Sequence, residues 1–148
     1  MKRLLTVTLL AAAIGAAAEP AVGTWKLNIA KSKLRNTPRS QVMTITQAGN
    51  GRTLESHTVA ADGKETHTKA TSIFDGKEHP YTGTDGGYDS YIASGAGYVY
   101  VVEFKKGGKA VRTVKSTYSK NGKTRTAVAK GVDENGKAYN TVSVYDRQ

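Results

Sequence analysis

The sequence predicts an all-β domain, an antiparallel up-and-down meander of about nine or ten strands that closes into a barrel. Short runs of alternating apolar and polar residues recur along the chain, and pairs rich in glycine, asparagine and aspartate separate them. One longer connection, 30–40, joins the first two runs. We expect strands near residues 23–29, 41–47, 52–60, 65–74, 77–82, 88–94, 98–105, 110–118, 124–131 and 137–146.

Closure of this meander follows from its edges. A flat sheet would leave two long strands unpaired, whereas a barrel pairs the first strand with the last. A two-sheet sandwich is the alternative, but sandwiches usually use longer crossover connections, and most connections here have hairpin length. A barrel is therefore favoured.

The first eighteen residues have the pattern of a cleavable secretory signal peptide. Lys2 and Arg3 precede an apolar run from Leu4 to Ile14, and the small residues Ala16 to Ala18 follow. The run is too short to span a membrane, and the chain has no cysteine for a lipid anchor or a disulfide. We expect no stable membrane anchor, location in the periplasm or the medium, and one domain over residues 19–148.

The strongly basic composition invites a nucleic-acid or acidic-lipid partner. The formal net charge is +10, and removing Lys2 and Arg3 with the signal leaves +8. The lysines lie mostly in turns, however, as in 105–109 and 120–123, and no basic helix or recognition motif accompanies them. We therefore expect a solvated loop surface, no nucleic-acid partner and a monomer.

Signatures of catalysis are scarce. The chain has no G-x-S-x-G, P-loop or H-E-x-x-H motif and no cysteine nucleophile, so we expect neither an enzyme nor a cofactor. If Asp62-Gly63 forms a two-residue turn, His57 lies opposite Thr68 on the next strand. His57 and His67 then point to opposite faces of the sheet, and we expect no metal site.

The period of two along each strand predicts which side chains line the interior. Aromatic and apolar positions of one parity are expected to point inward: Trp25, Leu27, Ile29, Ala70, Phe74, Tyr100, Val102, Phe104, Val114 and Tyr118. Small polar residues would share this wall and make the interior partly wet, namely Thr68, Ser72, Ser116 and Ser143.

Two arginines have the same inward parity. Arg112 shares its face with Tyr118, and Arg125 lies opposite Tyr118 if Asn121-Gly122 forms a tight turn. An inward guanidinium among tyrosines is an anion anchor. A rotated strand that places Arg125 in water remains equally open. Moreover, a two-residue turn at Asn135-Gly136 would place residue 126 opposite Tyr145 and Arg125 on the other face, unless a bulge or longer loop intervenes.

Both ends of the predicted domain resemble known barrel proteins. The segment 22–27, V-G-T-W-K-L, resembles the opening strand of fatty-acid-binding proteins and the G-x-W motif of lipocalins, and 144–147, V-Y-D-R, resembles the last strand of fatty-acid-binding proteins. The chain also resembles small exported bacterial proteins that open G-T-W-K-L-N-x-A-K-S-K. The resemblance implies a lipocalin-like (calycin) barrel in which Trp25 plugs the closed end and Arg147 covers it.

The sequence departs from this resemblance at three places. Fatty-acid-binding proteins insert two helices after the first strand, and 30–40 is too short for the pair, so a lid is not expected. Their R-x-Y carboxylate clamp falls on residues 143–145, S-V-Y, where the arginine is missing. The lipocalin T-D-Y turn is replaced by 84–86, T-D-G.

Two functions fit such a domain. The first is binding of a small hydrophobic, amphipathic or anionic ligand inside the barrel, with Arg125 in place of the missing clamp arginine. The alternative is an interaction or inhibitor module with a filled barrel. A cavity above about 300 Å³ would favour the ligand, and a filled interior with an exposed apolar patch would favour the partner. The predicted ligand site is Tyr100, Phe104, Tyr118, Arg125 and Tyr145.

The signal peptide makes a direct prediction. Because the A-x-A pattern ends at Ala18, exported protein should begin at or near Glu19. Intact-mass spectrometry of the exported protein measures this directly, and a mature chain that retains Met1 would contradict it.

Overall fold

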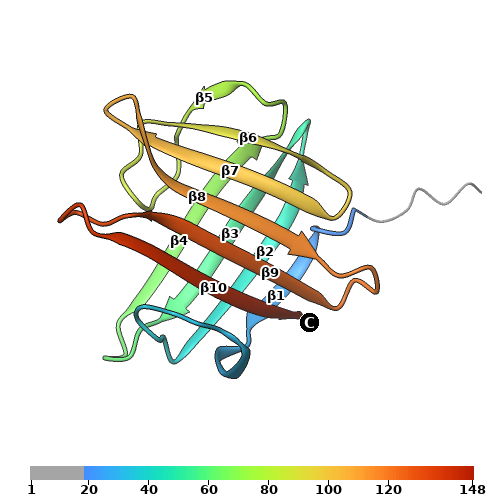
Figure 1. The fold of residues 1–148 in the computed structure, drawn as a ribbon. Helices are drawn as coiled ribbons and strands as arrows, with labels where there is room; N and C mark the ends of the chain where they lie inside the picture. Colours follow the sequence, from blue (N-terminus) through green and yellow to red (C-terminus); the bar gives the residue numbers. More distant parts are fainter. Residues whose placement is uncertain (1–18) are drawn as a thin grey trace, which may run out of the picture.

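Ten antiparallel strands follow one another around a single sheet in the computed structural model, which describes residues 19–148 (Figure 1). The predicted all-β class and barrel-forming meander are confirmed, and each strand lies within a few residues of its expected bounds. The predicted signal peptide, 1–18, lies outside the described residues. The strands are β1 Gly23–Leu27, β2 Ser40–Ala48, β3 Gly51–Val59, β4 Glu65–Ile73, β5 Glu78–Pro80, β6 Ser90–Ala96, β7 Val99–Lys106, β8 Lys109–Tyr118, β9 Thr124–Val132 and β10 Ala138–Arg147.

The barrel has its seam between β4 and β5. The hydrogen-bonded order is β4-β3-β2-β1-β10-β9-β8-β7-β6-β5, so the first strand pairs with the last, as expected, and β4 and β5 are the two edges. Near this seam, hydrogen bonds connect the end of β4 and the turn after it to β6: the Ile73 N–H donates to the Tyr91 hydroxyl at 3.0 Å, and the Gly76 N–H donates to the Ala93 carbonyl at 2.9 Å. The barrel is therefore nearly closed.

The connection between β1 and β2 begins with a short 3₁₀ helix, η1, Ile29–Lys31. The Asn28 side chain caps it by accepting a hydrogen bond from the Lys31 N–H at 3.1 Å. The prediction that Ile29 faces inward is wrong, because β1 ends at Leu27 and the alternation stops there; Ile29 is 37% exposed. No helix in residues 19–148 has the length and apolar character needed to cross a membrane.

The β3–β4 hairpin corrects the predicted histidine geometry. The Ala60 N–H donates to the Lys64 carbonyl at 2.8 Å, so the loop has three residues, 61–63, and ends in Gly63 at φ +89°. The extra residue shifts the register by one and places His57 directly opposite His67. The prediction that the two imidazoles point to opposite faces is therefore wrong.

The β9–β10 hairpin also has a three-residue loop, which again shifts the strand register by one residue from the register of a two-residue turn. The Asp133 N–H donates to the Lys137 carbonyl at 3.0 Å, and the loop 134–136 ends in Gly136 at φ +74°. A two-residue turn would have placed residue 126 opposite Tyr145, but the observed register places Arg125 there. The alternative in which Arg125 faces water is also wrong, since this residue is only 6% exposed.

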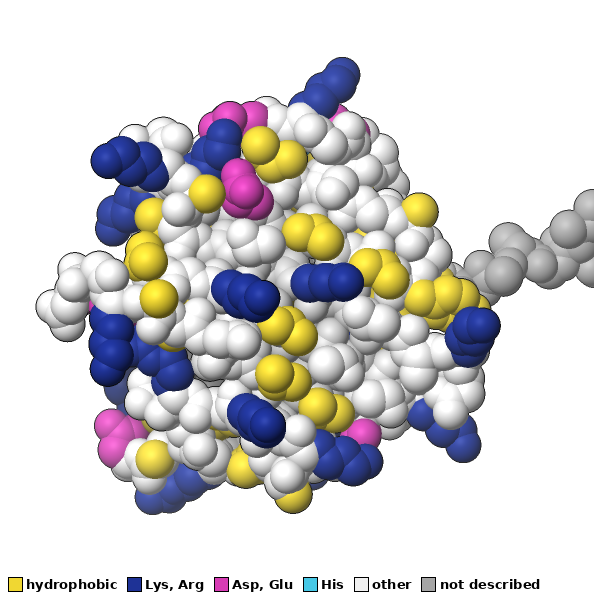
Figure 2. Space-filling view, viewed as in Figure 1, with side chains coloured by type: hydrophobic (Ala, Val, Ile, Leu, Met, Phe, Trp, Pro, Cys, Tyr) yellow, Lys and Arg dark blue, Asp and Glu magenta, His cyan; other side chains and the backbone are white. Residues whose placement is uncertain are grey.

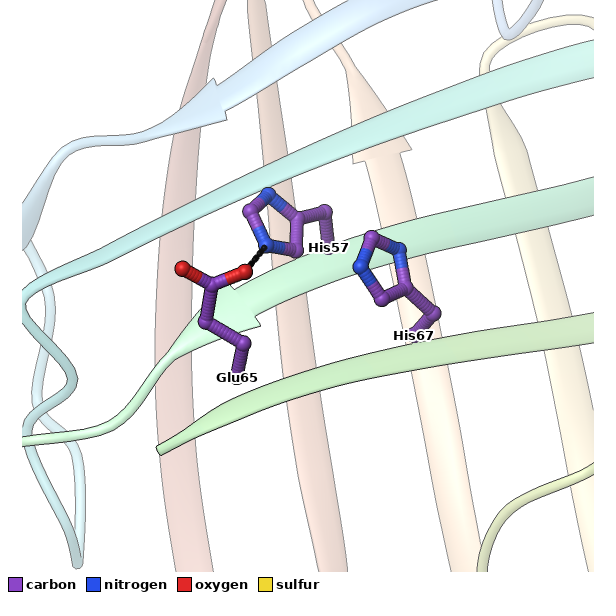
Figure 3. A group of neighbouring side chains, drawn as sticks. All are labelled: His57, Glu65 and His67. Carbon is purple, nitrogen blue, oxygen red and sulfur yellow. Dashed lines mark hydrogen bonds and ion pairs between the residues drawn. The ribbon is translucent and has the colours of Figure 1, made fainter. Parts of the chain in front are cut away.

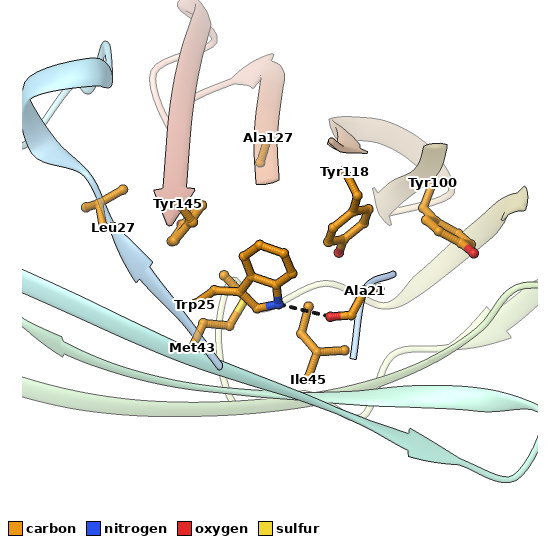
Figure 4. Close-up of a cluster of buried hydrophobic side chains, with 9 residues drawn as sticks. All are labelled: Ala21, Trp25, Leu27, Met43, Ile45, Tyr100, Tyr118, Ala127 and Tyr145. Atoms are coloured by element: carbon orange, nitrogen blue, oxygen red, sulfur yellow. Dashed lines mark hydrogen bonds between the residues drawn. The ribbon is translucent and has the colours of Figure 1, made fainter. Parts of the chain in front are cut away.

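The apolar core is centred on Trp25, which has no exposed surface (Figure 4). Its indole N–H donates to the Ala21 carbonyl at 2.9 Å, and its ring lies 5.4 Å from that of Tyr118. The chain before β1 thus folds under the barrel and satisfies the one polar atom of the indole. The buried cluster comprises Ala21, Trp25, Leu27, Met43, Ile45, Tyr100, Tyr118, Ala127 and Tyr145.

Arg147 covers the outer side of the Trp25 ring. Its guanidinium carbon lies 4.2 Å from the centre of the Trp25 ring, and its N–H groups donate to the carbonyls of Val22 at 2.7 Å and Pro20 at 2.6 Å. A third bond reaches Gly122 in the β8–β9 hairpin. Gly23, at φ +142°, leaves the space that the guanidinium occupies, which a side chain would fill. One cation therefore joins three segments at the closed end.

Truncation of Trp25 tests how much this buried indole contributes to the free energy of unfolding. Trp25→Ala should lower the free energy of unfolding by about 3–5 kcal/mol, because it removes a fully buried indole and leaves a cavity. Urea unfolding followed by circular dichroism measures the change. Tyr98→Ala, at an aromatic residue that is 42% exposed in a turn, is the control and should change stability by less than about 1 kcal/mol. A similarly small loss for Trp25→Ala would contradict the assignment.

Candidate functional site

A cavity of about 260 Å³ lies inside the barrel above the Trp25 plug. At about 30 Å³ per molecule it has room for roughly nine waters. All five residues of the predicted ligand site line it, namely Tyr100, Phe104, Tyr118, Arg125 and Tyr145. The small polar residues expected inside line it as well: Thr68, Ser72, Ser116 and Ser143. The wall is thus part aromatic and part hydroxylated.

A second hollow, of about 740 Å³, lies at the other end of the barrel from Trp25. The connection 34–38 and the β3–β4 hairpin around 58–62 form its walls. Gln41 and Ser143 line both this hollow and the inner cavity, so the two spaces adjoin at these residues. Access to the cavity is therefore expected from this end.

Arg125 is the most buried charged residue of the cavity wall. One terminal N–H donates to the Ser116 hydroxyl at 2.9 Å, and the guanidinium carbon lies 5.0 Å from the centre of the Tyr145 ring. Its Nε is buried and has no hydrogen-bond partner in residues 19–148. No carboxylate lies within 4.0 Å of it in this part of the chain. The charge is thus held in the interior without a counterion from the protein.

Arg112 provides a second interior guanidinium. It donates to the Tyr88 hydroxyl at 3.2 Å, and its Nε is also buried without a partner among the described residues. Burial would lower the pKa of Arg112, but the hydrogen bond to Tyr88, together with smaller charge interactions with Tyr88, Tyr139 and Asp85, outweighs it and raises this pKa. Arg112 is therefore charged at neutral pH.

One oxygen of the Asp85 carboxylate accepts a hydrogen bond from the Tyr81 hydroxyl. Burial raises the pKa of Tyr81 above its ordinary value, and the bond to Asp85 raises it further. The phenol thus remains protonated and continues to donate to Asp85. This carboxylate lines the cavity but forms no ion pair within 4.0 Å with either interior arginine among the described residues.

Arg52, in contrast, forms an ion pair at the closed end. Its guanidinium donates to the Glu19 carboxylate at 2.6 Å and lies 3.8 Å from the centre of the Tyr100 ring. The Tyr100 hydroxyl donates to the same carboxylate at 2.9 Å. Burial raises the pKa of Tyr100. Glu19 therefore balances the charge of Arg52, whereas Arg112 and Arg125 form no ion pair within 4.0 Å among the described residues.

Tyr145 contacts Gln41, where the cavity and the second hollow adjoin. Its hydroxyl donates to the side-chain oxygen Oε1 of Gln41 at 2.7 Å, and the side-chain amide nitrogen of Gln41 donates to the Thr58 hydroxyl at 2.9 Å. The sequence reasoning missed Gln41 and Arg52, although each has the inward parity of its strand. It also missed Tyr81 and Asp85, which lie in an irregular segment where no periodicity marks them.

Solved structures share this arrangement of strands. The fluorescent protein UnaG superposes with a TM-score of 0.61 at 17% identity, over 88% of this chain and 98% of that one. The zebrafish ileal bile acid-binding protein, complexed with cholic acid, gives a TM-score of 0.55 at 14% identity over 87% and 99%. The fold is calycin-like. No family model matches this calycin-like chain, and no curated sequence matches it.

The unpaired charge makes a prediction about stability. Arg125→Met should leave the free energy of unfolding unchanged or raise it by up to about 2 kcal/mol, because it removes a buried cation that lacks a counterion. Ser116→Ala should instead lower stability by about 1–3 kcal/mol, since it removes the hydrogen-bond partner and keeps the charge. Chemical denaturation of the three proteins gives both values. A loss above 2 kcal/mol for Arg125→Met would show that the cation stabilises the empty barrel.

Proposed function

We propose that the protein binds a small amphipathic anion inside the barrel, attracted by the interior guanidiniums of Arg125 and Arg112. One observation carries this proposal: both guanidiniums face the same cavity, and both have a buried Nε without a partner among residues 19–148. An anion with two or more oxygens would accept hydrogen bonds from the terminal N–H groups of such a guanidinium. Arg125, opposite Tyr145, would serve where the last-strand arginine of the carboxylate clamp is missing.

The energetic argument concerns the cost of the buried charge. Removing an ion from water costs several kcal/mol even after the protein relaxes. Proteins keep such destabilising groups mainly where function needs them. Among the residues that line the cavity, Arg52 is paired with Glu19, and Asp85 is the one carboxylate beside Arg52, Arg112 and Arg125 in this lining. The cavity therefore carries an excess of positive charge that an anionic ligand would balance.

The rest of the cavity wall suits the apolar part of such a ligand. Phe104 stacks on Tyr88 with ring centres 4.6 Å apart, and Tyr81 packs edge-on against Phe104 at 5.5 Å. Together with Tyr100 and Tyr118 they offer flat, apolar surfaces beside the guanidiniums. The similar zebrafish protein, whose structure contains cholic acid, supports this class of ligand. The cavity volume of about 260 Å³ lies below the value of about 300 Å³ that would by itself favour a ligand, so the proposal rests on the two arginines and is limited to a small molecule.

The alternative, an interaction module with a filled barrel, has less support. The interior contains a cavity, and the exposed large hydrophobic residues occur at four places along the chain: Ile29, Val42, Tyr98 with Val99, and Val132. On the face shown in Figure 2, lysine and arginine side chains are spread out between small hydrophobic groups. We therefore propose a binding role without catalysis, and we place it in the periplasm or medium on the basis of the signal-like residues 1–18.

Paired probes test the role of the ligand charge. The wild-type protein should bind 1-naphthoate, an aromatic carboxylate, more tightly than 1-naphthalenemethanol, its uncharged counterpart of similar shape. Arg125→Gln and Arg112→Gln should each weaken naphthoate binding by about 1.5–3 kcal/mol, the value of a hydrogen bond to a charged group. Calorimetric titration measures both affinities.

The matched control is Lys115→Gln, which removes one positive charge from the outer face of the strand that carries Arg112. It should leave naphthoate affinity unchanged. Equal affinity of the wild type and both arginine variants for naphthoate would refute the proposal, as would no preference for the acid over the alcohol.

A further inference from the structure

The outer face of β3 and β4 brings together two of the three histidines of the chain and a glutamate (Figure 3). The rings of His57 and His67 lie parallel, with centres 4.3 Å apart and planes 12° from each other. The Nε2 of His57 lies 3.1 Å from a carboxylate oxygen of Glu65. One ligand atom from each of the three residues lies within 4.8 Å of the other two.

We propose that His57, His67 and Glu65 form a surface site for a divalent transition-metal ion of the zinc class. Two imidazole nitrogens and one carboxylate oxygen form a ligand set that zinc accepts, with a fourth position left for water or another donor. Imidazole also suits copper and nickel, whereas calcium and magnesium prefer oxygen. The donor set therefore selects transition metals.

Metal binding requires the His67 ring to turn out of its stack on His57, because two parallel rings cannot both direct a nitrogen lone pair at one ion. Ligand atoms around a tetrahedral zinc ion at about 2.1 Å are about 3.4 Å apart. The contact between His57 and Glu65 already has nearly this length, so His67 must make most of the approach. Its side chain is exposed and makes no hydrogen bond in residues 19–148, which leaves it free to turn. The backbone register holds both histidines in place while their rings adjust.

The charged groups around the site do not oppose a cation. Lys69, two residues beyond His67 on the same face, is paired with Glu55 at 2.7 Å. The neighbour of His57 on β2 is Val42, which carries no charge. The Glu65 carboxylate faces the histidines and would offset part of the charge of the ion.

Zinc titration of untagged protein by isothermal calorimetry tests the site, since a histidine tag would itself bind the ion. The wild type should bind one Zn²⁺ per chain. His57→Ala and His67→Ala should each weaken binding by about tenfold or more, and Glu65→Gln should also weaken it. All three residues lie at the surface, so circular dichroism should show that the variants fold.

The third histidine provides the control. His79 pairs with Asp75 at 2.9 Å and belongs to no part of the cluster, so His79→Ala should bind zinc as the wild type does. Electron paramagnetic resonance of bound Cu²⁺ should show coupling to two imidazole nitrogens in the wild type and to one in each variant at position 57 or 67. Absence of zinc binding in the wild type would overturn the proposal. Unchanged binding in both His57→Ala and His67→Ala would also overturn it.

Discussion

The number of residues in each hairpin loop is the constraint on which this barrel depends. Its wall is a single sheet, so each side chain points either into the interior or out to solvent, and a shift of one residue reverses every choice along a strand. The loops 61–63 and 134–136 each contain three residues and end in a glycine with positive φ. These two loops place Arg125 opposite Tyr145 inside and His57 opposite His67 outside.

The arginines at the closed end and those further along the barrel differ in their hydrogen-bond and ion-pair partners. At the closed end Arg147 donates to three backbone carbonyls above Trp25, and Arg52 is neutralised by Glu19. Further along, Arg112 and Arg125 each have one side-chain partner and an unsatisfied Nε. The first region is built for stability, whereas the second retains hydrogen-bonding capacity in a space that water or a ligand can enter. This contrast supports the proposal of an anion site.

Much of this fold could be predicted from the sequence, because turn residues and alternation act locally. They located ten strands, and parity within each strand correctly placed Tyr100, Phe104 and Arg112 along the cavity. The pairing register between neighbouring strands was harder to predict, since Asp-Gly and Asn-Gly suit both two-residue and three-residue loops. That ambiguity alone caused the wrong facing of His57 and His67. The segment 81–89 could not be predicted, because irregular backbone carries no period.

The most direct measurement of the central claim is native mass spectrometry of the protein purified gently from its own source. An interior built to hold an anion predicts a non-covalently bound acidic molecule in the wild type, and loss of that molecule in Arg125→Gln. A ligand-free chain carrying a stoichiometric protein partner would contradict the account, as would a bound molecule retained equally by both proteins.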